Sequence, residues 1–383
     1  MTRLQTLLQA FIDAGTIPGA VGLVAKGDQV EVASVGLATV DPAQPMNRDT
    51  IFRIASVTKP IVAAAAMMLV DDGILRLEDS IDKWLPELAH LNVVRTPQSA
   101  LDDVVPAKRS ITVEDLLTFR AGYGFPSDFS LPAAQVLFQK GAFLWGRDPD
   151  TLPTSDEWLK LVATIPMIAQ PGEKWLYNMP SDILGILIAR ASGESLPEFL
   201  QRQLFDPLGM VDTAFLVPAE KRDRFGSFYR RGPGGELSLI DGPNGMWRVE
   251  PRLPAGSGGL ASTVDNLLAF ARLLANGGAF NGQQLIKPES VKQMMTDHLT
   301  ADQREASTLF LEGQGWGYGA SVDVDPANPW IMPGRYGWVG GSGTTWHVVP
   351  SDGTVVILLT QMELGGPSTT PLMHEVWQYA YSA

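Results

Sequence analysis

The sequence contains no cysteine among its 383 residues. This absence excludes disulfide bonds, thiolate metal sites and a cysteine nucleophile. Histidine is also scarce: the chain has four, and none stands in a spacing such as His-Glu-x-x-His that is typical of a metal site. Glycine motifs that bind phosphate or dinucleotides are missing as well. We therefore expect neither a metal ion nor a cofactor.

Basic residues and long apolar runs are also few. The chain has 29 Lys and Arg against 42 Asp and Glu, a net charge of −13, which argues against nucleic acid because such binding neutralises phosphates with basic residues. The longest apolar run, residues 61–70, is about half the length of a membrane span. Residues 4–11 predict an amphipathic helix and not a secretion signal. We expect a cytoplasmic protein without membrane contact.

Strand patterns occur at both ends of the chain and helical patterns in the middle. Two β-rich runs lie within residues 19–39, joined by the tight turn "KGD", and "TTWHVVP" and "GTVVILLTQ" follow near the C-terminus. This order predicts an α/β protein in which residues 1–68 and 245–383 form one domain. Residues 69–244 form an inserted, mainly helical domain. Long loops are expected at 121–133, 145–155 and 226–259.

Two Ser-x-x-Lys pairs are candidate nucleophile and base, while the Gly-x-Ser-x-Gly elbow of α/β-hydrolases is missing. Residues three apart share a helix face, but a lysine acts as a base only where its pKa is lowered. Lys83 follows Ser80 among three acidic residues, which keep it charged. Lys59 follows Ser56 and precedes an apolar run. The flanks favour Ser56, although a helix cap and a surface lysine give the same spacing.

Two further stretches carry possible chemistry. In "PGEKWLYNMPSDILG", Tyr177 precedes a helix start; a phenol can transfer protons, and a core position is the alternative. In "YGWVGGSGTTWHVVP", glycines at 340, 341 and 343 allow close backbone approach beside a strand, whose free N–H groups can stabilise an oxyanion. A glycine-rich hairpin is the alternative for this second stretch.

Taken together, these stretches resemble the serine β-lactamase-like hydrolases, and above all the family VIII carboxylesterases, which look like class C β-lactamases and penicillin-binding proteins. "FRIASVTKPI", "PGEKWLYNMPSDILG" and "GWVGGSGTTWHVVP" carry the resemblance, and "DPLGMVDTAF", "GSGGLASTVDNLLAFARLL" and "GWGYG" extend it over nearly the whole chain. The resemblance implies a β-lactamase-like fold: an antiparallel sheet flanked by helices, with an inserted mainly helical domain.

The resemblance also implies a set of roles. Ser56 is the acylated nucleophile at the start of a central helix, and Lys59 and Tyr177 form the proton-relay pair. The oxyanion hole combines the N–H of Ser56 with one from the final strand, which the "WVGG" match places at Gly341. The implied activity is hydrolysis of small acyl esters through a Ser56 acyl-enzyme. An acyltransferase, an amide hydrolase or a weak β-lactamase on the same fold is the alternative.

Two departures from the β-lactamase pattern favour neutral esters over β-lactams. Trp338 stands where the third motif of β-lactamases and peptidases has Lys or His, and Met179 stands where their tyrosine motif has Asn. Trp338, Gly340, Tyr123 and Phe125 are the candidate substrate-binding residues, since aromatic side chains can line an apolar acyl pocket. Each aromatic residue is, taken singly, equally compatible with a core position. The expected partner is a small-molecule ester.

Overall fold

The computed structural model describes residues 1–144, 148–326 and 328–382. Within these ranges the central element is an eight-stranded antiparallel sheet in the order β12-β13-β14-β15-β16-β1-β2-β3. The two ends of the chain meet in it, because β1 (Gly19–Lys26) pairs with β16 (Thr354–Thr360). Its other strands are β2 (Gln29–Thr39), β3 (Gln44–Pro45), β12 (Gly315–Trp316), β13 (Ser321–Val322), β14 (Tyr336–Gly340) and β15 (Thr344–Val349).

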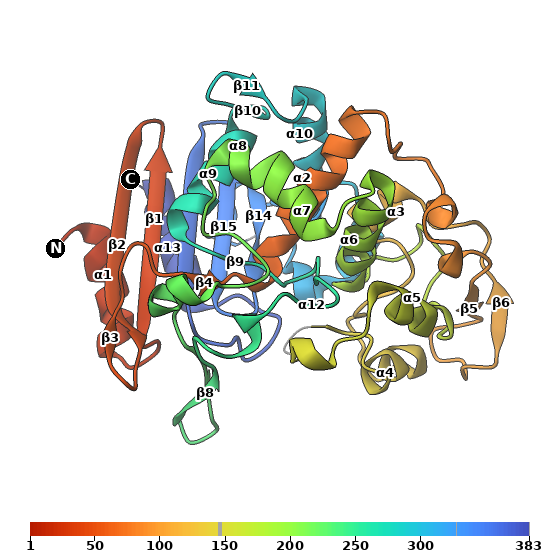
Figure 1. The fold of residues 1–383 in the computed structure, drawn as a ribbon, viewed down its shortest axis with the longest axis horizontal. Helices are drawn as coiled ribbons and strands as arrows, with labels where there is room; N and C mark the ends of the chain where they lie inside the picture. Colours follow the sequence, from red (N-terminus) through yellow and green to blue (C-terminus); the bar gives the residue numbers. More distant parts are fainter. Residues whose placement is uncertain (145–147, 327, 383) are drawn as a thin grey trace.

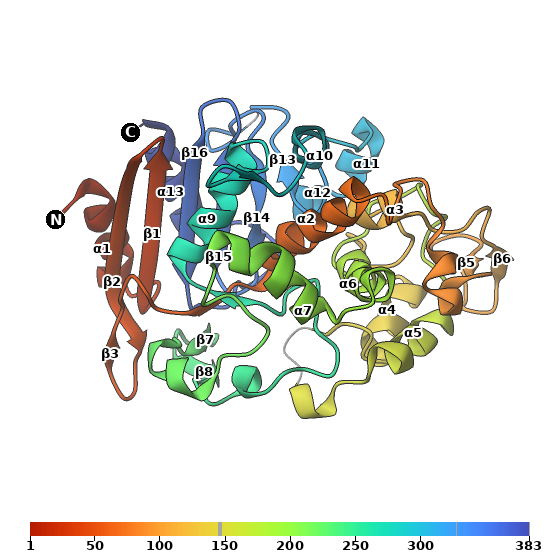
Figure 2. The same ribbon diagram turned by 45° about the horizontal axis from the view of Figure 1, so that its top comes forward.

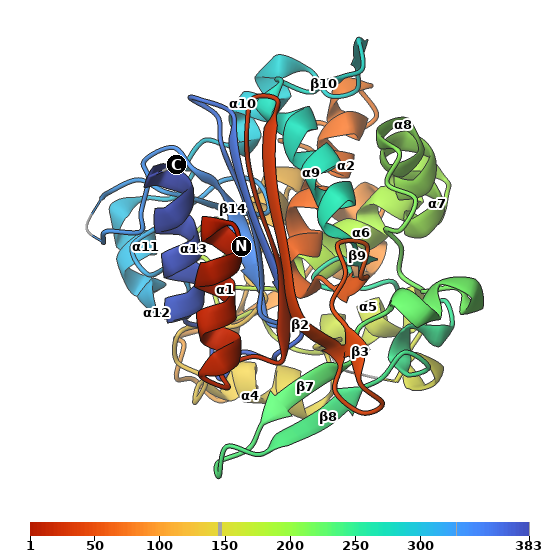
Figure 3. The same cartoon turned by 90° about the vertical axis from the view of Figure 1, so that its left-hand side faces the viewer.

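Helices cover both faces of the sheet, which confirms the expected flanked antiparallel sheet (Figure 3). On one face lie α1 (Arg3–Asp13) and α13 (Pro371–Ser382), side by side. The other face carries α9 (Val264–Ala275) and α2 (Thr58–Asp71). Because both faces are covered, β16 is buried along its whole length, and its sequence is a continuous apolar run instead of an alternating one.

Several of the remaining helices gather on the side of α2 away from α1 and α13 (Figures 1 and 2). Apolar side chains from this region and from α2 form one large core, in which α2 packs against α6. The division of the chain at residues 68 and 245 stays a prediction. The helices of this region are α3 (Val113–Leu117), α4 (Pro132–Gln139), α5 (Ser155–Ala163) and α6 (Met179–Ser192). The chain then returns through α7 (Leu196–Leu200), which contacts α2, to α8 (Asp206–Leu208), which contacts α9.

One predicted loop contains regular structure. Residues 226–259 include a hairpin of β7 (Phe228–Arg231) with β8 (Leu237–Asp241). The prediction of a loop without regular structure was therefore wrong for this segment. The hairpin is largely exposed and its turn is rich in Pro and Gly, which gave the segment the composition of a loop. Residues 145–147 of another predicted loop lie outside the described residues.

Smaller elements complete the fold. The pairs β5 with β6 and β10 with β11 are two-stranded ribbons, and β4 with β9 joins the segment before Ser56 to the start of α9. Their bounds, with those of the last three helices, are β4 (Phe52–Arg53), β5 (Asn92–Val94), β6 (Val104–Pro106), β9 (Ala261–Ser262), β10 (Ala279–Phe280), β11 (Gln283–Gln284), α10 (Pro288–Met294), α11 (Ala301–Ala306) and α12 (Thr308–Leu311).

The end of β14 lies directly against the short turn η1 (Ala55–Val57) that leads into α2. A Cβ atom on Gly340 would stand 2.5 Å from the Ile54 carbonyl oxygen and 2.3 Å from Thr344 Oγ1. Thr344 Oγ1 donates a hydrogen bond to the same Ile54 oxygen at 3.0 Å. Glycine is therefore required at position 340 for the strand to approach the backbone before η1.

We expect Gly340→Ala to destabilise the protein by about 1–3 kcal/mol, because the added methyl group overlaps backbone atoms. Gly341→Ala is the matched control, since no heavy atom lies within 4 Å of the Cβ position there. Denaturant unfolding of both variants measures the difference. Equal loss of stability in the two variants would contradict this account.

Candidate active site

Ser56 lies in η1, between β4 and α2, and it faces a cavity. The residue before it, Ala55, has a φ of 45°, a left-handed conformation that alanine rarely adopts and that costs about 1–3 kcal/mol. The turn is held because the Ile54 N–H donates to the Leu260 carbonyl at 3.1 Å and because Gly340 packs behind Ala55. The surrounding fold therefore imposes the sharp bend that presents Ser56 at the head of α2.

The Lys59 amine is fully buried and has three oxygen neighbours. Its Nζ lies 2.8 Å from Ser56 Oγ, 2.8 Å from Asn178 Oδ1 and 2.5 Å from the Ser257 carbonyl oxygen. The amide oxygen and the carbonyl oxygen can only accept hydrogen bonds, so they take two N–H bonds of the lysine. A neutral amine has only two, and its lone pair then points at Ser56 Oγ. The geometry fits a lysine that acts as the base for Ser56.

Burial also favours the neutral form of the Lys59 amine. It lowers the pKa of Lys59 to about 7, and the negative charge of Asp182 opposes that shift. Asp182 is itself fully buried, and burial raises its pKa. Its Oδ1 accepts from the Ser257 N–H at 2.9 Å, and its Oδ2 has no partner among the described residues. Ser257 thus connects the two groups: its N–H binds the Asp182 carboxylate and its carbonyl oxygen binds Lys59.

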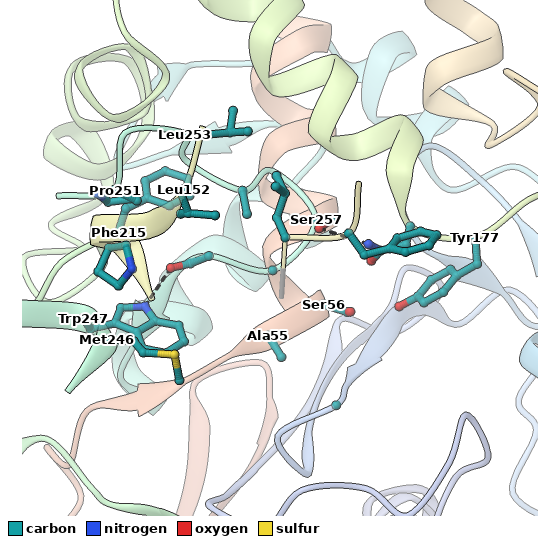
Figure 4. Close-up of a pocket in the computed structure, with 18 of the residues that line it drawn as sticks. Ala55, Ser56, Leu152, Tyr177, Phe215, Met246, Trp247, Pro251, Leu253 and Ser257 are labelled. Carbon is teal, nitrogen blue, oxygen red and sulfur yellow. Dashed lines mark hydrogen bonds between the residues drawn. The ribbon is translucent and has the colours of Figure 1, made fainter. Parts of the chain in front are cut away.

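The Tyr177 hydroxyl lies beside Ser56 (Figure 4). It hydrogen-bonds Ser56, and it accepts from Trp338 Nε1 at 2.7 Å. An indole N–H can only donate, so the phenol proton points away from Trp338, toward Ser56 Oγ. Burial raises the pKa of Tyr177 to about 12, which keeps this proton in place at neutral pH. The ring is held by stacking on Trp175 and lies 4.6 Å from Lys59 Nζ.

The cavity in front of Ser56 has a volume of about 220 Å³ and a mostly apolar lining. Ser56 and Tyr177 lie at one end, and Phe215, Trp247 and Pro251 at the other (Figure 4). No charged side chain of the described residues lines it. The described residues that line it are Ala55, Ser56, Phe125, Phe143, Leu144, Pro149, Leu152, Tyr177, Asn178, Phe215, Met246, Trp247, Pro251, Leu253, Ala255, Ser257, Gly258, Gly259 and Gly341.

The structure brings together most of the residues singled out from the sequence. Ser56, Lys59, Tyr177 and Trp338 form one contact group, as described above, and Gly341 and Phe125 line the cavity. Gly340 lies behind the nucleophile turn, against the backbone. Tyr123 is elsewhere: it is fully buried and donates to the Ile165 carbonyl at 2.9 Å, so its side chain belongs to the core and not to the lining.

Three polar residues of the site were missed. Asn178 adopts a φ of 84°, which turns its amide back toward Lys59, and nothing in the sequence pattern indicates that conformation. Asp182 was interpreted only as part of a helix start. Ser257 lies 80 residues after Tyr177 in an irregular segment, so no periodicity connects it to the site. The one available signal was an acidic residue, Asp182, directly before the apolar run of α6.

Other kinds of site lack support in the part of the chain that the structure describes. No group of three or more His, Asp or Glu side chains there is arranged to hold a metal ion. Across the same residues, every helix is too short or too polar to cross a bilayer.

Comparison with known proteins gives one consistent family. A family model described as beta-lactamase matches residues 4–378. The chain is 37% identical to Protein Rv1367c of Mycobacterium tuberculosis over 93% of this chain and 89% of that protein. It is 31% identical to Esterase EstB of Burkholderia gladioli over 98% and 94%. The solved structure of EstCE1, a hydrolase with promiscuous acyltransferase activity, matches with a TM-score of 0.80 at 25% identity, covering 98% and 97%.

The lowered pKa of Lys59 predicts how the reactivity of Ser56 depends on pH. Below pH about 7 the amine is protonated and has no lone pair, so the rate of Ser56 labelling by a fluorophosphonate probe should rise as pH increases through about 7. Asp182→Asn removes the charge that favours the ammonium form, so the midpoint should move to lower pH. Glu173→Gln, which removes an exposed carboxylate, is the control. A midpoint that stays in place or rises in folded Asp182→Asn protein contradicts the assignment.

Proposed function

Because the chain belongs to the beta-lactamase family, we propose that it is a serine carboxylesterase of the family VIII type that hydrolyses small acyl esters through an acyl-enzyme on Ser56. The observation that carries the proposal is the set of contacts around Lys59 Nζ. Two acceptor oxygens take its N–H bonds and leave the lone pair directed at Ser56 Oγ, 2.8 Å away. A serine hydroxyl needs such a base to become a nucleophile.

In the acylation step, Ser56 Oγ attacks the ester carbonyl carbon while Lys59 takes its proton. The carbonyl oxygen becomes an oxyanion, which the backbone N–H groups of Ser56 and Gly341 bind. When the C–O bond to the alcohol breaks, Tyr177 gives its proton to the departing alkoxide. The products of this step are the alcohol, the acyl-enzyme, a tyrosinate and a lysine ammonium ion.

Deacylation reverses the two proton transfers. Water enters the site, gives a proton to the Tyr177 oxygen and adds to the acyl carbonyl. The tetrahedral intermediate then expels Ser56 Oγ, which recovers its proton from Lys59. One ester and one water give one alcohol and one acid, and both proton-transfer groups return to their starting states.

The electrostatics of the site support a neutral substrate. The motif position of Trp338 lacks the cation that would pair with a substrate carboxylate, and the indole N–H is already bonded to Tyr177. The described lining of the cavity is uncharged. A charged group placed there would lose its hydration without gaining a partner, so neutral esters are favoured over β-lactams and peptides.

Acyl transfer to an alcohol is the second candidate, and the apolar lining favours it because such a cavity binds an alcohol better than water. EstCE1 is described as having this activity in addition to hydrolysis. An ester substrate supplied with an added alcohol separates the two reactions. A new ester as the main product assigns a transferase, and a free acid assigns a hydrolase; nitrocefin turnover at a comparable rate would support a β-lactamase.

We expect Ser56→Ala to abolish hydrolysis of a short-chain p-nitrophenyl ester, because no other group can form the acyl-enzyme. Ser80→Ala is the matched control: it removes the serine of the second Ser-x-x-Lys pair, whose hydroxyl only accepts a hydrogen bond from the Asp82 N–H at the start of a short helix. Release of p-nitrophenol measures both. Retained activity in Ser56→Ala would overturn the proposed function.

Trp338→Phe removes the N–H that orients the phenol of Tyr177. A general acid matters most for a basic leaving group, so kcat/KM for an ethyl ester should fall at least about tenfold. The p-nitrophenyl ester of the same acid leaves without help and should lose much less. Steady-state kinetics on this pair of esters distinguishes the role. An equal loss on both esters indicates that Trp338 only supports the fold.

A further inference from the structure

Trp247 lies at the end of the cavity away from Tyr177, with Phe215 and Pro251, and Met246 lines the cavity beside it (Figure 4). Met246 and Trp247 follow β8 in the turn η7 (Met246–Arg248). The Trp247 indole N–H donates to the Gly259 carbonyl at 2.8 Å, which fixes the ring along the cavity. The position of this wall sets how much room a substrate has beyond Ser56.

Arg53 lies three residues before Ser56, on β4, and contacts that wall from behind. Its side chain is buried, at 2% exposure. The guanidinium carbon lies 3.9 Å from the ring centre of Phe225 and 5.1 Å from that of Trp247. A planar guanidinium can stack on aromatic rings in this way, and an ammonium cannot reproduce that geometry.

The hydrogen bonds of Arg53 all lead to the segment that carries the wall. Its Nε donates to Asp241 Oδ2 at 2.7 Å, and its Nη2 donates to the same oxygen. Two backbone carbonyls take the other bonds: Gly226 accepts at 2.6 Å and Gly242 at 2.9 Å. The second oxygen of Asp241 accepts from the Met246 N–H at 2.8 Å. A continuous chain of contacts thus runs from the nucleophile strand through Asp241 to the wall.

Stability alone gives no reason for this pair. Buried ion pairs lose hydration, and apolar residues of similar volume often replace them without loss of stability. An apolar pair in the same place would lack the directional hydrogen bonds that hold η7 at a fixed angle to β4. The backbone oxygen of Arg53 also accepts from Ser342 Oγ, next to Gly341 of the oxyanion hole. This contact uses only the backbone of Arg53, so a substitution of the side chain leaves it in place and affects the cavity wall alone.

The site geometry indicates which part of an ester meets the wall. The acyl carbon bonds to Ser56, and the alcohol departs toward the proton of Tyr177. The acyl substituent is then directed away from Tyr177, along the cavity toward Trp247 (Figure 4). The cavity of about 220 Å³ has room for far more than an acetyl methyl group, and each buried methylene contributes about 0.8 kcal/mol of hydrophobic free energy to substrate binding.

We propose that Arg53, acting through Asp241, is a positioning residue that fixes the Met246–Trp247 wall and thereby selects esters with a bulky neutral acyl group, branched, cyclic or aromatic, over acetyl esters. This inference rests on the proposed esterase function. It enlarges the small acyl group expected from the sequence, since Trp247 of the wall lies at the far end of the cavity and an acetyl group does not reach it.

The test compares p-nitrophenyl acetate with p-nitrophenyl cyclohexanecarboxylate, which share a leaving group. The unmodified protein should prefer the cyclohexanecarboxylate in kcat/KM. In Arg53→Lys, which keeps the charge but loses the two-pronged contact and the stacking, this preference should fall about tenfold, mainly through KM. The kcat for the acetate should stay within about threefold, because the acetyl group does not contact the wall.

Two further variants distinguish a specific change in acyl preference from a general loss of stability. Asp241→Asn keeps the shape of the carboxylate but removes its charge, and it should reduce the same preference in the same direction. Arg335→Lys is the matched control. Arg335 is equally buried, pairs with Asp323 at 2.8 Å and lies 4.4 Å from the Trp377 ring on the α13 face of the sheet. It should lower stability without changing the acyl preference.

The outcomes separate the two proposals. Loss of ester hydrolysis in Ser56→Ala together with an unchanged acyl preference in folded Arg53→Lys and Asp241→Asn would overturn the role of Arg53 and leave the esterase in place. A preference of the unmodified protein for acetate would also overturn it, as would an equal change in Arg335→Lys. Ester hydrolysis that persists in Ser56→Ala would overturn the proposed function itself.

Discussion

The burial of one amine, Lys59 Nζ, governs the rest of the site. A buried amine must either be neutral or have neighbours that compensate its positive charge. At Lys59, burial favours the neutral form, and the neighbouring groups provide hydrogen-bond acceptors and a negative charge. Two acceptors, Asn178 Oδ1 and the Ser257 carbonyl, satisfy its N–H bonds, and Asp182 supplies a nearby charge. Asn178 and Asp182 come from the start of α6, and Ser257 comes from a segment far away along the chain. The apolar run of α2, the start of α6 and the segment around Ser257 must therefore meet at this point.

The distribution of protons in the site follows from what each group can donate. Trp338 can only donate, so it determines the direction of the Tyr177 hydroxyl. The phenol proton then meets Ser56 Oγ from one side while Lys59 meets it from the other. Tryptophan at this position thus has two consequences: no cation stands there to pair with an anionic group, and the phenol proton is directed to Ser56 Oγ.

Sequence reasoning succeeded where the signal was local. The strands near both ends of the chain follow from their apolar patterns. Ser56 was preferred over Ser80 because of flanking residues, and α2 is indeed buried. Sequence reasoning failed where the geometry depends on distant segments. It did not predict the backbone conformation of Asn178 or the contact of Asp182 with Ser257, and it placed Tyr123 in the substrate site instead of the core. The hairpin of β7 and β8 was missed because its exposed strands lack a periodic apolar face.

The hydrogen bond between Ser342 and the Arg53 backbone has a consequence for the order of events during synthesis. The two residues are 289 positions apart, so the contact forms only after almost the whole chain has left the ribosome. Closing so large a loop makes folding slow compared with that of proteins rich in local contacts. It also means that a chain ending before residue 257 contains Ser56 and Lys59 but lacks the Ser257 carbonyl, and one ending before residue 342 lacks the Ser342 contact as well. The set of contacts around Ser56 is therefore complete only once the last strands of the sheet are present.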